Sequence, residues 1–283
     1  MTVRLVDYLD KGASLGPDAP CLTTDGRSSS YAQVRELSFR IAAALARRGV
    51  EPGDKVAILS ANDPIAFSCV FGISRAGAVW CPINPRNEAA ENRELLELFE
   101  CGTLIFQSSF APLVAKLSLP ELTLVCLDGA VEGALTWEEF LGEGSLDRPA
   151  VDDLAMLVGT GGTTGRPKGV QLTGVNLEAM TALTLMSYPF EGRPTYLALA
   201  PLTHAAGVLC FPVLSLGGEI VVMRAPDVGQ FLALAQRHRV THAFLPPTLV
   251  YLLLAHPDLD GTDLSALQCL WYGAAPMSPD RLE

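Results

Sequence analysis

The sequence LVGTGGTTGRPK at positions 157–168 is rich in glycine and threonine and ends in a single lysine. It continues a short apolar run, 154–158, which favours a strand. Its four glycines let the backbone turn so that several N–H groups can face one anion without a clash with Cβ atoms. Threonine hydroxyls and the lysine ammonium add donors and one positive charge. We therefore predict a phosphate-binding loop built from Thr160, Gly161, Gly162, Thr163, Thr164, Gly165 and Lys168.

Two common phosphate-binding motifs do not fit this loop. A proline precedes Lys168 and a glycine follows it, whereas the Walker loop requires Gly-Lys-Ser/Thr. Counted from Gly159, the third glycine of a dinucleotide motif would fall on Thr164, and residues 169–172 look extended rather than helical. The predicted local structure is strand, loop, strand. A surface loop without a ligand is the alternative; we favour phosphate binding because hydroxyl donors are combined with only one cation.

The composition is that of a globular chain that can bury a large core, since 49% of its 283 residues are hydrophobic. The formal net charge of −11 argues against nucleic acid or an anionic membrane as a general partner, because both attract basic surfaces. The seven cysteines lack the paired spacing of zinc sites or disulfide frameworks, so we expect reduced core residues. Charged residues near the N-terminus leave no apolar signal-peptide core. We expect a cytoplasmic protein without a transmembrane segment; peripheral membrane association stays open.

Short apolar runs alternate with helical patterns along the chain, which is typical of α/β layering around parallel strands. The clearest helix begins with a capping-box pattern at Ser30 and Gln33 and ends before Gly49. Asp63 and Pro64 begin another helix. Further helices are expected at 88–100, 175–187, 208–216, 228–238 and after residue 247, and strands at 56–59, 78–81, 103–107, 122–127, 154–158, 169–172, 196–200, 219–223, 242–245 and 268–272. Residues 128–152 are expected to form a surface loop excursion.

The stretch TGGTTGRPKG at 160–169 closely resembles the signature of the adenylate-forming superfamily, which includes acyl-CoA synthetases, aryl-CoA ligases, luciferases and the adenylation domains of peptide synthetases. Further stretches resemble the family in the same order and span nearly the whole chain. They are Ser30-Tyr31, RAGAVWCPINP at 75–85, PLTHAAG at 201–207, LPPT at 245–248 and YGAAP at 272–276. The chain looks most similar to the N-terminal portion of fatty-acid or aryl-acid CoA ligases.

The resemblance implies an α/β fold of layered sheets with flanking helices, organised as two interwoven subdomains. Residues 1–64 together with residues 190–283 would form the first subdomain, incomplete at its C-terminus. Residues 65–189 would form the second and carry the phosphate loop.

The resemblance also implies how ATP is held. In the family the matching loop closes over the β- and γ-phosphates, which implies direct contacts from the loop threonines and Lys168 and a catalytic role for this lysine. The adenine would lie at the turn after the last predicted strand, formed by Gly273, Ala274, Ala275 and Pro276. Without the resemblance, the same residues are ordinary turn composition.

His204 is the second candidate catalytic residue and the candidate for contacting the carboxylate substrate. The resemblance implies that it lies near the substrate carboxylate, with Gly207 beside the acyl group; a histidine that only caps the following helix is the alternative. Amino-acid-activating relatives place an acidic residue in this region. None occurs between residues 201 and 211, which favours a fatty or aromatic acid. The remaining histidines have no partners at metal-ligand spacing and are expected to carry no chemistry; they are His238, His242 and His256.

Two departures from the family pattern bear on function. Gly174 replaces the usual histidine after the loop, which leaves the size of the acyl substrate open. The later motifs, among them the glutamate that binds Mg²⁺ and the lysine that drives adenylation, are not present in these 283 residues. We therefore assign no metal ligand here and expect little or no turnover from this chain alone.

The function implied is that of the N-terminal portion of an ATP-dependent acyl-CoA synthetase. With ATP, Mg²⁺ and CoA, such an enzyme converts a fatty or aromatic carboxylic acid into an acyl-AMP and then a CoA thioester. Two alternatives stay open: a fatty acyl-AMP ligase that passes the acyl group to a carrier protein, and a non-catalytic nucleotide- or acyl-binding module. A homodimer is left open.

Overall fold

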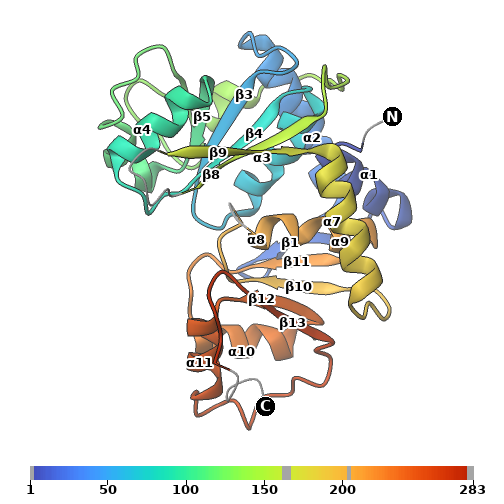
Figure 1. Cartoon of the computed structure of the whole chain (residues 1–283). Coiled ribbons are helices and arrows are strands. Elements are labelled where there is room, and N and C mark those ends of the chain that lie inside the picture. The colour runs from blue at the N-terminus through green and yellow to red at the C-terminus, as the bar shows by residue number, and fades with distance from the viewer. Residues whose placement is uncertain (1–2, 161–166, 203–204, 279–283) are drawn as a thin grey trace.

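The protein was analysed as a computed structural model that describes residues 3–160, 167–202 and 205–278. Within these ranges the strands form one six-stranded and one seven-stranded sheet, and helices cover the faces of both (Figure 1). The predicted α/β class of layered sheets with flanking helices is confirmed.

The helices and strands follow one another along the whole described chain. The helices are α1 (Leu5–Leu15), α2 (Tyr31–Arg47), α3 (Pro64–Arg75), α4 (Ala89–Leu98), α5 (Ala111–Val114), α6 (Trp137–Leu141), α7 (Gly174–Ser187), α8 (Ala205–Val208), α9 (Cys210–Ser215), α10 (Val228–Arg237) and α11 (Pro247–Leu254). The strands are β1 (Pro20–Thr24), β2 (Arg27–Ser30), β3 (Lys55–Leu59), β4 (Val79–Ile83), β5 (Cys101–Phe106), β6 (Thr123–Cys126), β7 (Leu135–Thr136), β8 (Leu154–Thr160), β9 (Lys168–Thr173), β10 (Thr195–Ala198), β11 (Glu219–Val222), β12 (His242–Leu245) and β13 (Cys269–Tyr272).

The seven-stranded sheet has the order β7-β6-β5-β3-β4-β8-β9. Its neighbouring strands are parallel except β8 and β9, which pair antiparallel as a hairpin. The central strands are buried on both faces, and every residue of β4 is buried. This explains their nearly continuous apolar sequence, which is expected for parallel strands covered on both sides.

The six-stranded sheet has the order β13-β12-β10-β11-β1-β2. β1, from the N-terminal part of the chain, lies parallel to β11, with Leu22 opposite Ile220. The two ends of the described chain therefore share one sheet, while β3 lies inside the other. The chain has thus reached the second sheet by Lys55, before the predicted boundary at residue 64; the division into subdomains itself stays a prediction.

The two sheets and their helices are stacked in five layers, in the order helices, sheet, helices, sheet, helices, and buried side chains fill the spaces between the layers. One core cluster contains residues of both sheets, such as Leu22 and Trp80, together with residues of α1, α2, α3 and α9, so these helices lie between the sheets. A second cluster lies under α4 on the outer face of the seven-stranded sheet. A third lies under α10 and α11 on the outer face of the six-stranded sheet (Figure 1).

The predicted helix ends are confirmed where a local hydrogen bond defines them. Ser30 and Gln33 form the capping box of α2, and Gly49 adopts a left-handed φ of 84° after the helix. Asp63 caps α3 by accepting hydrogen bonds from the N–H groups of Ile65 and Ala66 at 2.8 and 3.1 Å. The predicted helix at 208–216 is instead two short helices, α8 and α9.

Residues 128–152 are not only a loop, so this prediction was wrong in part. They contain β7 and α6, and Thr136 forms a capping box with Glu139 at the start of α6. Arg47 of α2 donates to the carbonyl oxygens of Leu141 and Glu143 at 2.7 and 2.6 Å. These contacts are between residues far apart in sequence, so composition alone could not reveal them.

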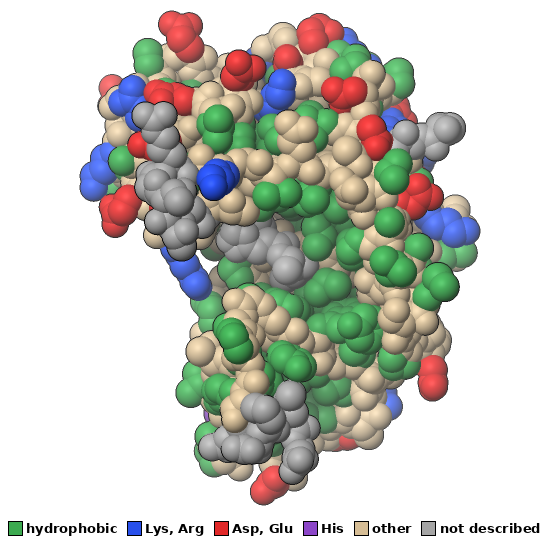
Figure 2. All heavy atoms as spheres, in the orientation of Figure 1, with side chains coloured by type: hydrophobic (Ala, Val, Ile, Leu, Met, Phe, Trp, Pro, Cys, Tyr) green, Lys and Arg blue, Asp and Glu red, His purple; other side chains and the backbone are tan. Residues whose placement is uncertain are grey.

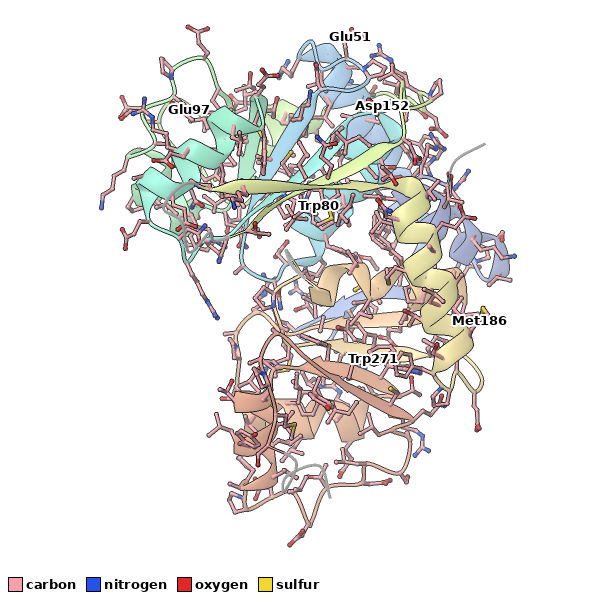
Figure 3. The ribbon with its side chains drawn as sticks, viewed as in Figure 1. Glu51, Trp80, Glu97, Asp152, Met186 and Trp271 are labelled. Atoms are coloured by element: carbon pink, nitrogen blue, oxygen red, sulfur yellow. The ribbon has the colours of Figure 1, made fainter. Side chains whose placement is uncertain are left out.

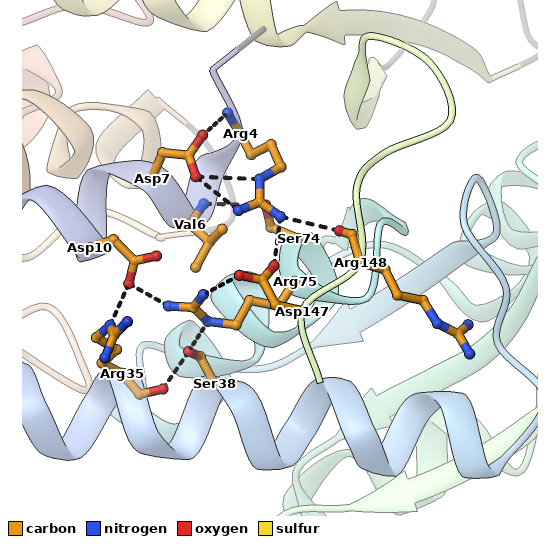
Figure 4. A network of polar contacts seen from close by, with 10 residues as sticks. All are labelled: Arg4, Val6, Asp7, Asp10, Arg35, Ser38, Ser74, Arg75, Asp147 and Arg148. Carbon is orange, nitrogen blue, oxygen red and sulfur yellow. Dashed lines mark hydrogen bonds and ion pairs between the residues drawn. The ribbon is translucent and has the colours of Figure 1, made fainter. Parts of the chain in front are cut away.

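Arg75, at the end of α3, carries a fully buried charge. It connects the segment 128–152 to the N-terminal helix α1. Its guanidinium pairs with Asp10 of α1 and lies 3.0 Å from the carboxylate of Asp147. It also donates to the Ser38 hydroxyl at 2.7 Å (Figure 4). Its guanidinium lies 3.8 Å from the ring centre of Phe39. Because its polar atoms are paired, the buried charge is tolerated.

α7 carries an exposed apolar stripe. Leu183 and Met186 are exposed, the latter to 83%, and Figure 3 places Met186 on the outer side of this helix. Figure 2 shows apolar side chains gathered between the two halves of the molecule on this face.

No helix within the described ranges is long and apolar enough to cross a membrane. None of the seven cysteines forms a disulfide, and the burial predicted for them is confirmed for most: Cys21, Cys69, Cys81, Cys126 and Cys210 are buried, whereas Cys101 and Cys269 are partly exposed.

Candidate functional site

The stretch predicted to be the phosphate loop lies between β8 and β9, which confirms the two predicted strands on either side of it. Thr160 pairs with Lys168 at the end of the β8–β9 hairpin where residues 161–167 connect the two strands, and the Thr160 hydroxyl lies 3.5 Å from the Lys168 carbonyl oxygen. Lys168 is exposed, and its ammonium forms no ion pair with any residue that the structure describes. The predicted contacts at Gly161, Gly162, Thr163, Thr164 and Gly165 lie outside the described residues.

Two glycines beside the loop are explained by packing. A Cβ atom on Gly159 would lie 2.8 Å from the side chain of Leu95 in α4, and one on Gly169 would lie 2.5 Å from the ring of Phe99. These glycines let α4 approach the hairpin closely. No local sequence pattern could reveal this role, because the partner residues are more than sixty positions away.

The predicted adenine turn directly follows β13 at the carboxyl end of the strand. Ala274, Ala275 and Pro276 are exposed, and Gly273 lies near the ring of Phe244. Ala274 has a left-handed φ of 67°, which costs an alanine about 1 kcal/mol. Such strain in an exposed turn is typical of binding loops. The contact with adenine itself stays a prediction.

His204 lies outside the described residues, but the chain on both sides of it is placed. Gly207, in α8, lies against the backbone of Leu202, so closely that a Cβ atom on it would be 1.9 Å from the Leu202 carbonyl oxygen. This position requires glycine for steric reasons. Its predicted contact with the acyl group stays a prediction.

The same segment is held by Asn62, a residue that sequence reasoning missed. Asn62 follows β3 of the seven-stranded sheet, and its side-chain Nδ2 lies 3.1 Å from the carbonyl oxygen of Ala200, after β10 of the other sheet. Its Oδ1 accepts a hydrogen bond from the Leu202 N–H at 2.8 Å. The one sequence feature that pointed to Asn62 is its position directly before Asp63, the residue that caps α3.

A cavity of about 210 Å³ lies where the carboxyl ends of strands from both sheets meet. Its lining includes Asn62 and Arg86 from the seven-stranded half and Pro201 and Arg224 from the other half. In Figure 1 the hairpin end of β8 and the end of β13 lie on this same side of the molecule. Ligands of open α/β sheets bind at such carboxyl edges. Among the described residues, no hydrogen bond or ion pair joins Lys168 to the β13 turn.

His242, one of the three histidines expected to carry no chemistry, makes contacts that stabilise the fold. His242 is buried, stacks on Phe190 with ring centres 4.2 Å apart, and lies 2.7 Å from the Thr241 hydroxyl and 2.8 Å from the Pro189 carbonyl oxygen. Burial lowers the pKa of His242, while the hydrogen bond to Pro189 opposes this shift. Across the described ranges, no group of three or more His, Cys, Asp or Glu side chains is placed to hold a metal.

Comparison with known proteins bears on this arrangement. A feruloyl-CoA synthase of Amycolatopsis sp. is 34% identical over 270 residues, which cover 95% of this chain and 54% of the relative. A medium/long-chain fatty-acid–CoA ligase of Mycobacterium tuberculosis is 37% identical over 131 residues, covering 46% of this chain and 23% of the relative. The chain thus spans about half the length of the first relative.

The fold is shared with solved structures. The amide bond synthetase McbA of Marinactinospora thermotolerans superimposes with a TM-score of 0.86 at 27% identity, over 97% of this chain and 56% of that one. Residues 9–283 match the family described as AMP-binding enzyme. Because this match covers nearly the whole chain, the protein belongs to the AMP-binding enzyme family.

Proposed function

We propose that this chain provides the ATP-phosphate and carboxylate sites of an acid–thiol ligase. In the proposed reaction a carboxylate oxygen attacks the α-phosphorus of ATP, and the bond to the leaving pyrophosphate breaks, which gives an acyl-AMP. The thiol of CoA, having lost its proton, then attacks the acyl carbon and displaces AMP. The observation that carries the proposal is the exposed Lys168, without an ion pair among the described residues, at the end of the β8–β9 hairpin where residues 161–167 connect the strands.

The role proposed for Lys168 is electrostatic. The chain has a net charge of −11, so an ATP site on it needs a local positive charge. An ammonium beside the β- and γ-phosphates neutralises the charge that grows on pyrophosphate as it leaves. Thr160, described at the same hairpin end, would place its hydroxyl beside the same phosphates.

The β13 turn would hold the adenine. Residues 273–275 are glycine and alanines, so a flat base can approach the backbone without meeting a long side chain. In parallel sheets a nucleotide lies at the carboxyl ends of the strands, where this turn lies.

ATP, Mg²⁺ and CoA belong to the proposal as the adenylyl donor, the counter-ion of its phosphates and the thiol. Since the described residues contain no cluster suited to a metal, we assign no Mg²⁺ ligand among them. The residues of this chain bind and orient the phosphates and the acid.

The substrate we propose is an aromatic carboxylic acid, because the relative matched along 95% of this chain is a feruloyl-CoA synthase. The absence of an acidic residue between 201 and 211 in the sequence disfavours an amino acid, whose ammonium would need a counter-charge. A fatty acid is the second candidate, favoured by the 37% identity to a fatty-acid–CoA ligase over a shorter stretch.

A second acceptor for the acyl group is favoured by one observation. The solved relative McbA, at 27% identity, is an amide bond synthetase. An acyl-AMP could therefore be passed to an amine or to a carrier protein instead of CoA, with AMP leaving in the same way.

The proposal is tested by titrating the chain with ATP and Mg²⁺ in a calorimeter. Lys168→Ala should weaken ATP binding about tenfold or more, because a charge-assisted contact to phosphate is lost. Lys116→Ala is the matched control, since it removes an equally exposed lysine away from the hairpin. Equal ATP affinity of the Lys168 variant and the wild type would contradict the phosphate site.

The substrate class is tested separately by adding a hydroxycinnamic acid or a medium-chain fatty acid to the chain with ATP. Binding that needs ATP and favours the hydroxycinnamic acid supports the aromatic assignment. Preference for the fatty acid would replace it with the second candidate.

A further inference from the structure

We infer that the outward face of α7 is an interface between two copies of this chain, which pair in solution through an antiparallel contact of their α7 helices. The centre of this face is a row of exposed residues that we call the α7 seam: Val175, Ala179, Ala182 and Met186. The pairing does not depend on the proposed reaction, because no residue of the seam belongs to the proposed phosphate, adenine or carboxylate contacts.

α7 is apolar on its outward face as well as on its buried face. On the buried side, Leu177 belongs to the core cluster between the two sheets. On the outward side, Val175 is 54% exposed, Leu183 62% and Met186 83%, and Figure 3 places Met186 on the outer side of the helix. A surface helix normally turns polar side chains outward, whereas a helix that is apolar all round is one that is buried. Covering the outward face of α7 is therefore favourable.

The outward face of α7 is nearly uncharged, although the chain as a whole is strongly acidic. Glu178 is the one charged side chain among the 14 residues of α7. With a net charge of −11, two copies of the chain repel each other over most of their surfaces. In Figure 2 the middle of the face, where α7 lies, carries mostly apolar side chains, and charged ones crowd the upper part. At α7 two copies can therefore meet with little repulsion, and the helix offers no set of charges that would recognise a basic partner or an anionic lipid.

The spacing of the α7 seam fits a second copy of the same helix. Its residues are separated by four, three and four positions, which is the spacing of the apolar rows in a coiled coil. The spacing is the same from either end, so a two-fold axis can relate two antiparallel seams. Val175 then lies opposite Met186 of the second copy, and Ala179 lies opposite Ala182 of the second copy. Because alanines occupy the middle of the seam, the two helices can approach each other closely.

The size of this surface sets the strength of the pairing. α7 has 14 residues, so its outward face measures about 21 Å by 10 Å. Beside the seam lies an open groove of about 470 Å³, lined by residues of α7, among them Leu183, and by Tyr188. A lasting interface buries roughly 800 Å² on each partner, which is more than one helix face offers. We therefore expect a weak, reversible dimer with a dissociation constant in the micromolar range.

The test is sedimentation equilibrium of the 283-residue chain over micromolar to millimolar concentrations. The wild type should show a reversible equilibrium between monomer and dimer. Met186→Glu should weaken the dimer about tenfold or more, because two unpaired carboxylates would enter an apolar contact. Leu98→Glu is the matched control: Leu98 on α4 is 54% exposed, and the variant makes the same change of charge away from α7, so it should dimerise like the wild type. Glu178→Gln, which removes the charge beside the seam, should strengthen the dimer about threefold.

Cysteine cross-linking tests the antiparallel arrangement. Under mild oxidation, a mixture of Val175→Cys and Met186→Cys chains should form a cross-linked dimer, whereas Met186→Cys alone should stay at the wild-type background. Since all these variants change exposed residues, each should keep the fold.

A wild type that stays monomeric at every concentration would overturn the inference and leave this face of α7 to another polypeptide. Dimerisation that Met186→Glu does not weaken, or that Leu98→Glu weakens equally, would overturn it too. Efficient cross-linking of Met186→Cys with itself would contradict the antiparallel pairing.

Discussion

The carbonyl oxygen of Leu202 lies so close to Gly207 that a Cβ atom at position 207 would be 1.9 Å away from it. Because the clashing atom belongs to the backbone, the neighbour cannot move aside as a flexible side chain can. Gly207→Ala should therefore destabilise the protein by about 3 kcal/mol, measured by urea unfolding. Gly102→Ala is the control, since nothing lies within 4 Å of its added Cβ atom. Equal stability of the two variants would refute the contact.

The buried Arg75 should contribute strongly to stability. Arg75→Ala leaves Asp10 and Asp147 without their shared partner and opens space in the core, so we expect a loss of about 3–5 kcal/mol in the free energy of unfolding. Arg93→Ala, which breaks an exposed pair with Glu97, should change it by less than about 0.5 kcal/mol. A small effect of the Arg75 variant would show that solvent reaches this network.

The buried His242 should make stability depend on pH. Its pKa is lowered in the folded state, mainly by burial, so the unfolded chain binds the proton more tightly. The stability contributed by the neutral imidazole is fully present above the unfolded-state pKa of about 6.5 and is lost as pH falls toward the folded-state pKa. Melting temperatures measured from pH 8 to pH 5 should fall less steeply in His242→Gln than in the wild type. An unchanged slope in His242→Gln would contradict this pH dependence.

The left-handed backbone of Ala274 should respond to glycine. Ala274→Gly removes the strain of a φ of 67° and should stabilise the chain slightly, whereas Ala275→Gly only adds freedom to the unfolded chain and should destabilise it. The two variants should differ by about 1 kcal/mol in thermal or urea unfolding. If Ala274→Gly were the less stable of the two, strain at this turn would be excluded.

Local patterns in the sequence predicted much of the fold correctly. The caps at Ser30 and Asp63 and the strands on both sides of the loop depend on hydrogen bonds between residues a few positions apart, or on the alternation of apolar residues. For the same reason the helix and strand series was largely confirmed. The prediction of a surface loop at 128–152 was wrong in part, because the polar composition of this segment does not reveal its contacts with α2 and α3.

The candidate site was predicted only in part. The candidate residues at the ends of β8 and β13 could be named from the sequence, because each set belongs to one continuous motif. Asn62 could not be found in this way, because its partners begin 136 positions later in the chain. The positions of Gly161 to Gly165 and of His204 stay predictions from the sequence.

The sequence by itself determined the family, the α/β class and the pair of strands around the predicted phosphate loop, since these depend on short motifs and on hydrophobic periodicity. Only the tertiary structure decided that β1 pairs with β11, that Gly159 and Gly169 admit α4, and that Asn62 fastens one sheet to the other. These relationships form between segments that the chain must first bring together over long loops, so their energies depend on packing geometry and leave no local pattern in the sequence.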